Sequence, residues 1–78
     1  MTSTRHHALK GAFDWERFGK SLKKEIKRRE INIKAAAETT GMSRNTFYER
    51  MNGDPCSVEL LLYLCHEFNL DPWDYFQK

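Results

Sequence analysis

The length, composition and charge of this protein limit what it can be. With 78 residues it has room for one small domain, so every element must contribute apolar side chains to a shared core. Apolar residues make up 40% and charged residues 31% of the chain, a balance typical of soluble globular proteins. No apolar run approaches the roughly 20 residues that span a bilayer, and residues 1–11 lack the apolar core of a signal peptide. We therefore expect a cytoplasmic protein with no membrane segment.

Charge is distributed unevenly along the chain, although the net charge is only +2. Residues 1–34 hold ten Lys/Arg against four Asp/Glu, residues 35–53 hold two against two, and residues 54–78 hold one against five. A basic first half beside an acidic end indicates one positive face that could meet a polyanion. A solvated helix face is the ordinary alternative for such a run of charge.

Residues 1–12 show no hydrophobic periodicity, and we expect them to form a flexible N-terminal arm, with or without a role in binding. The folded domain would then cover residues 13–78. Its first helix, expected over residues 14–29, begins at Asp14, whose carboxylate can cap the first-turn amides. Apolar residues then recur every three or four positions and form one stripe: Trp15, Phe18, Leu22 and Ile26.

The central part of the chain predicts two short helices, residues 33–40 and 44–52, joined by a tight turn. Gly41 ends the first helix, because a residue comfortable at positive φ is needed there. Ser43 is a good N-cap for the second helix. Phe47 and Met51 are four residues apart and share one face of it. This pattern is typical of a helix-turn-helix.

Two further helices are expected near the C-terminus, over residues 58–69 and 72–77. The first follows Ser57 as N-cap, and the second follows Asp71 with Pro72 at its first position. The apolar stripe expected on the fourth helix consists of Val58, Leu61, Leu62, Cys65 and Phe68, widened by Leu60 and Leu64. Strand-like alternation is absent from the sequence, so the fold class is all-α, with five helices.

The chain resembles the lambda-repressor/Cro superfamily, also called the XRE family, over residues 15–76. The residues that carry the resemblance lie in the helix-turn-helix: Ala37, Gly41, Met42, Phe47 and the closing Met51-Asn52-Gly53. The resemblance implies a five-helix DNA-binding domain whose second and third helices form the helix-turn-helix. It also implies a sequence-specific transcriptional regulator, in the manner of Cro-like repressors from phages, plasmids or prokaryotes.

The leading turn of the helix over residues 44–52 is predicted to read bases in the major groove. Arg44 can bind the two acceptors of guanine, and Asn45 can match the acceptor and donor of adenine. Tyr48 and Glu49 lie one turn later, where they could contact a thymine methyl, a phosphate or a cytosine amine.

Contacts to DNA phosphate are predicted for four residues around the helix-turn-helix: Lys34, Ser43, Arg50 and Asn52. In many relatives the position of Arg50 is apolar, and here the neighbouring Met51 would supply the buried side chain. Ile33 stands where the family often has a glutamine that holds a phosphate. The chain therefore departs from the family at this phosphate contact, and Lys34 becomes the more important predicted contact to phosphate.

A homodimer on a palindromic operator is expected, because one recognition helix reads too few base pairs to select a site. The expected interface is the aromatic cluster of residues 72–77, which comprises Trp73, Tyr75 and Phe76. Of these, Trp73 and Phe76 could instead close the core beneath the fourth helix, which makes Tyr75 the preferred interface residue.

Catalysis is not predicted, because the sequence shows no plausible set of nucleophile, base and orienting acid. We expect no cofactor, metal or small-molecule ligand, and we interpret Cys56 and Cys65 as reduced thiols. The competing functional hypothesis is a protein-interaction module, such as an antitoxin or adaptor, built on the same fold.

Overall fold

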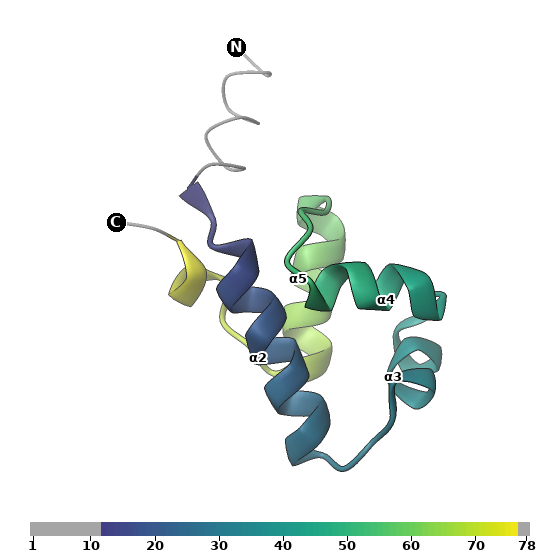
Figure 1. Ribbon diagram of the computed structural model, residues 1–78. Helices are drawn as coiled ribbons and strands as arrows, with labels where there is room; N and C mark the ends of the chain where they lie inside the picture. The colour runs from purple at the N-terminus through teal and green to yellow at the C-terminus, as the bar shows by residue number, and fades with distance from the viewer. Residues whose placement is uncertain (1–11, 77–78) are drawn as a thin grey trace.

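A computed structural model describes residues 12–76, which form an all-α fold (Figure 1). The elements in chain order are α2 (Trp15–Arg28), α3 (Ile33–Thr40), α4 (Arg44–Met51), α5 (Val58–Phe68) and the 3-10 helix η1 (Pro72–Tyr75). The four longer helices match their predicted bounds to within one residue at each end. The expected fifth helix is a single 3-10 turn instead. The arm predicted for residues 1–12 lies outside the described residues except for its last position.

Helix starts were predictable because each depends on a local hydrogen bond. At the start of each helix a side chain accepts from a backbone amide two or three residues further on: the predicted caps Asp14, Ser43, Ser57 and Asp71, and Asn32 before α3. A cap of this kind stabilises a helix by about 1 kcal/mol. Gly41 ends α3 with a φ of 72°, as expected of its left-handed turn.

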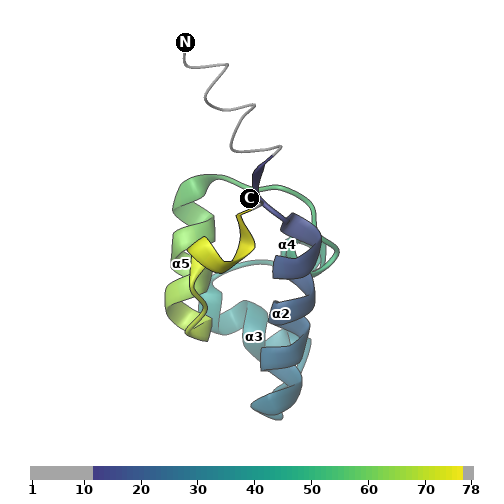
Figure 2. The same ribbon diagram turned by 90° about the vertical axis from the view of Figure 1, so that its left-hand side faces the viewer.

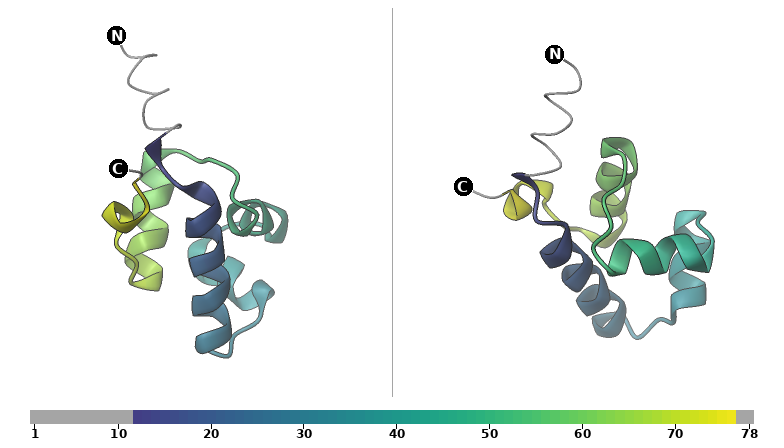
Figure 3. Two further views of the ribbon diagram at one scale, coloured as in Figure 1. Left: turned by 60° about the vertical axis from the view of Figure 1, so that its left-hand side comes forward. Right: turned by 45° about the horizontal axis from the view of Figure 1, so that its top comes forward.

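The helices lie around α2, which contacts α4 on one side and η1 on the other (Figure 3). From the direction of Figure 2, η1 lies between α5 and α2. The side of α2 at Gly19 approaches α4 closely, because a Cβ built there would lie 2.9 Å from the carbonyl carbon of Met51. The absence of a side chain at Gly19 thus allows α4 to rest on α2.

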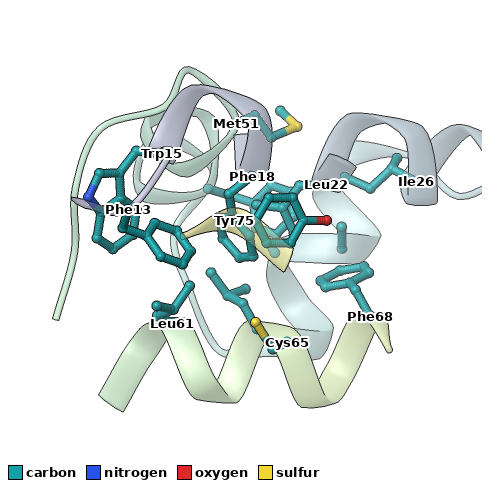
Figure 4. Close-up of a cluster of buried hydrophobic side chains, with 14 residues drawn as sticks. Phe13, Trp15, Phe18, Leu22, Ile26, Met51, Leu61, Cys65, Phe68 and Tyr75 are labelled. Atoms are coloured by element: carbon teal, nitrogen blue, oxygen red, sulfur yellow. The ribbon is translucent and has the colours of Figure 1, made fainter. Parts of the chain in front are cut away.

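The core lies between α2, α4 and α5 and is closed by η1 (Figure 4). Its largest fully buried side chains are Phe18, Leu22, Phe47, Leu64 and Phe68. Within residues 12–76, no helix combines the length and the apolarity that crossing a membrane requires.

The stripe predicted for α5 is partly wrong. Leu61, Cys65 and Phe68 are buried as expected, but Val58 is 46% and Leu62 is 52% exposed. Each residue of an α-helix is turned by about 100° from its neighbour, so Leu62 points away from the face on which Leu61 is buried. The described part of the chain leaves this edge of α5 open to solvent.

Candidate nucleic-acid interface

The turn between α3 and α4 holds the two helices as one corner. The backbone amide of Met42 donates to the carbonyl of Ala37 at 2.9 Å, which closes the turn after Gly41. Ala36 and Ala37 are buried, and their small side chains let α4 pack closely on α3. The corner is therefore fixed by both backbone hydrogen bonds and close packing.

The inner face of α4 is anchored in the core. Phe47 is fully buried, with its ring centroid 6.0 Å from that of Phe68 on α5, and Met51 is 6% exposed. This anchoring determines which side of α4 faces solvent, since residues three and four apart share a face.

The outer face of α4, formed by Arg44, Asn45, Tyr48 and Glu49, is exposed. These are the four residues predicted to contact bases, and the structure brings them together on one side of a single helix. Tyr48 is 49% exposed although it follows a fully buried phenylalanine. The arrangement leaves two helical turns of polar side chains accessible to a ligand.

The residues predicted to contact phosphate differ in whether their polar groups are available to a ligand. Lys34 is exposed on the first turn of α3, and Asn52 is exposed at the end of α4. The hydroxyl of Ser43 caps α4: it accepts from the amide of Thr46 and donates to the Thr46 Oγ1 at 3.0 Å. Lys34 and Asn52 thus offer donor groups to a ligand, while Ser43 is already engaged within α4.

The prediction for Arg50 is wrong. Its side chain is buried, and its Nη1 donates to the carbonyl oxygen of Pro55 at 2.9 Å, while its Nη2 lies 3.4 Å from Glu49 Oε1. Arg50 therefore ties the end of α4 to the loop that leads into α5. Its position three residues after Phe47 places Arg50 on the inner face of α4, but this spacing does not reveal the carbonyl group that Arg50 binds.

Tyr75 is not a surface residue, so the preferred interface position within the aromatic cluster is also wrong. Tyr75 is 6% exposed, with its ring centroid 5.4 Å from that of Phe18, whereas Trp73 is 74% exposed. Phe76 is half-buried and lies against Phe13 and Trp73, with centroid distances of 5.1 Å to each. A 3-10 helix has three residues per turn, so Tyr75, two residues after Trp73, faces another side of η1 and is turned inward, while Phe76 follows the helix in extended backbone.

The two cysteines are free and poorly suited to nucleophilic or metal chemistry. Burial raises the pKa of the Cys65 thiol to about 11. Burial also raises the pKa of Cys56, an effect that the nearby Arg50 guanidinium opposes. Both thiols are therefore protonated at neutral pH, and the thiolate is the reactive form. No cluster of three or more potential metal-ligating side chains occurs in the part of the chain that the structure describes.

Charge on the corner of α3 and α4 is balanced. Exposed Lys34 and Arg44 are offset by exposed Glu38 and Glu49. The basic excess of the first half of the chain lies instead on α2. No family model, no curated protein and no solved structure matches this chain.

Proposed function

We propose that the protein is a sequence-specific DNA-binding transcriptional regulator with a lambda-repressor-like fold, a Cro-like repressor of phage, plasmid or prokaryotic origin. The observation that carries the proposal is the division of α4 into a buried inner face and an exposed polar outer face. The inner face is anchored by Phe47 and Met51, and the outer face presents Arg44 and Asn45 at the start of the helix. The major groove accepts one α-helix presented in this way.

In the proposed complex the outer face of α4 enters the major groove. Arg44 binds a guanine and Asn45 an adenine through paired hydrogen bonds, and Tyr48 and Glu49 contact the next bases. Lys34 and Asn52 donate to phosphates and set the register of the helix on the duplex. Because the charge at this corner is balanced, base contacts have to contribute a larger share of the binding affinity than general electrostatic attraction to the phosphates does.

We expect Arg44→Ala to cost roughly 1–3 kcal/mol on the preferred site and to relax preference at one base pair. Lys34→Ala is the comparison variant: it should weaken binding to all sequences alike and lower the salt slope by about one. Selection from a random duplex library followed by anisotropy titrations measures both effects. An Arg44→Ala protein that ranks sequences as the wild type does would make Arg44 a phosphate contact. Failure of the wild type to enrich any sequence would overturn the proposed function.

The proposal includes a homodimer on a palindromic operator, with two α4 helices entering successive major grooves about 34 Å apart. Trp73 and Phe76 are the surface aromatics that could pair the subunits, and Val58 and Leu62 add exposed apolar area on α5. Such a patch is small, so the free protein would associate weakly and pair on DNA.

We expect Trp73→Gln to reduce the preference for a palindrome over a single half-site, with little change in melting temperature because Trp73 is 74% exposed. The measurement is a titration of both duplexes, with sedimentation of the free and bound protein. Equal affinity of the wild type for both duplexes, with one protein on each, would exclude the dimer.

The exposed apolar residues also favour the second candidate, a protein-interaction module such as an antitoxin or adaptor. Val58, Leu62 and Trp73 would then contact a different protein rather than a second copy of this chain. Library selection separates the two functions, because an interaction module of this kind would enrich no DNA sequence.

A further inference from the structure

The outer side of α2 concentrates the positive charge of the chain. This helix carries six cations against two acids: Arg17, Lys20, Lys23, Lys24, Lys27 and Arg28 against Glu16 and Glu25. The cations in its ion pairs are exposed: Lys20 lies 3.5 Å from Glu16, and Arg28 lies 2.7 Å from the half-buried Glu25, which also pairs with Arg29 just beyond the helix at 3.4 Å. Solvent weakens such pairs, so they leave the positive potential of the surface largely in place.

Part of this surface forms an open hollow, and one of its lining side chains is held against an aromatic ring. Arg17, Lys20, Ser21 and Lys24 line a hollow of about 280 Å³, and their spacing of three and four residues places them on one face. The Arg17 guanidinium lies 5.3 Å from the centroid of the buried Tyr75 ring. This cation–π contact holds Arg17 at the end of the hollow nearest η1.

The basic hollow points away from the proposed DNA-reading surface. α4 approaches α2 at Gly19, and rotation by about 100° per residue places Lys20 about 100° and the other three lining residues about 140–160° around the helix from Gly19. Figure 3 likewise shows α4 and η1 on opposite sides of α2. A duplex bound to α4 would therefore leave the basic hollow uncovered.

We infer that the basic hollow of α2 binds the phosphate backbone of a second DNA segment, so that one protein can hold two duplexes together. Lysine, arginine and serine side chains are the donors that proteins use for phosphate. Arg17 and Lys24 are separated by about 10 Å along the helix axis, which matches about three nucleotides of one strand.

The chemistry of this face argues against a lipid surface. The apolar residues of α2 are all buried (Trp15, Phe18, Leu22 and Ile26), so the hollow offers nothing to insert into a bilayer. With cations and a hydroxyl alone, binding would be independent of base sequence and strongly dependent on salt. This second contact is additional to the proposed reading by α4.

The test is capture of a dye-labelled random 30-bp duplex by beads that carry a second random duplex, with the protein between them. We expect Lys20→Gln/Lys24→Gln to reduce capture at least tenfold. By anisotropy it should lower the salt slope for duplex binding by about two, one for each lost phosphate contact. Lys23→Gln/Lys27→Gln is the matched control, since it removes the same charge from the same helix at residues that do not line the hollow, and it should retain capture.

Equal loss in the two double variants would show that net charge alone matters, and would overturn the proposal. Undiminished capture by Lys20→Gln/Lys24→Gln would also overturn it. The two α4 helices of a dimer would then join the duplexes, and the hollow would be left for another ligand, such as an acidic protein. Failure of the proposed function is distinguishable: library selection would enrich no sequence, while the effect of Lys20→Gln/Lys24→Gln on the salt slope for binding of one duplex would persist.

Discussion

Replacing Phe47 with alanine is expected to lower the free energy of unfolding by about 3–5 kcal/mol, the cost of removing a fully buried aromatic ring. The ring is enclosed between α4 and α5, and Phe68 cannot fill the space without moving its own helix. A domain this small has few kcal/mol of stability in total, so much of the Phe47→Ala protein should be unfolded at 25 °C. Thermal and urea melts followed by circular dichroism measure the loss.

The adjacent Tyr48 provides the control for this experiment. It is an aromatic residue on the same helix but is 49% exposed, so Tyr48→Ala should change stability by only about 0.5 kcal/mol. If the two variants melted alike, the inner and outer faces of α4 would be assigned the wrong way round. The outer-face contacts proposed for DNA would then be misplaced as well.

Gly19→Ala is expected to destabilise the protein by about 1–3 kcal/mol, the usual cost of overpacking. At an exposed helix position the same change would stabilise by about 1 kcal/mol, because alanine favours the helix. Here the new methyl group would meet the backbone carbonyl of Met51, which cannot rotate aside as a side chain would. The clash should therefore outweigh the gain in helix propensity.

Lys20→Ala is the control for an alanine on the exposed side of α2: lysine and alanine have similar helix propensities and the lost pair with Glu16 is exposed, so stability should shift by no more than about 0.5 kcal/mol. Gly19→Ala should also weaken DNA binding, because it pushes the end of α4 away from α2. A Gly19→Ala protein more stable than the wild type would mean that α2 and α4 can separate without cost.

Local signals in the sequence were sufficient to predict the helices. Asp14, Ser43 and Ser57 were identifiable as caps because a cap needs only its own helix, and Gly41 because only its own φ matters. The burial of Phe47 and the exposure of the outer face of α4 followed from helical spacing in the same way.

Burial that depends on distant segments was not predictable. Tyr75 is buried because η1 folds back onto α2, and Leu62 is exposed because the described part of the chain leaves its edge of α5 open to solvent. Arg50 was mistaken for a surface cation because its partner, the carbonyl oxygen of Pro55, belongs to the loop beyond α4. For each of these residues, the deciding contact involves a chain segment that helical periodicity does not describe.

Under the proposed function, the separation of the two faces of α4 has a consequence for how the recognised DNA sequence would change during evolution. Substitutions at Arg44, Asn45 and Tyr48 would alter the preferred sequence without disturbing the core, so new operators are accessible in single steps. Glu49 is the exception, because its carboxylate lies 3.4 Å from the buried Arg50 guanidinium. Replacing Glu49 would leave that guanidinium with one partner fewer, which links a change of recognised base to a loss of stability. We therefore expect specificity to diverge first at the beginning of α4 and last at Glu49.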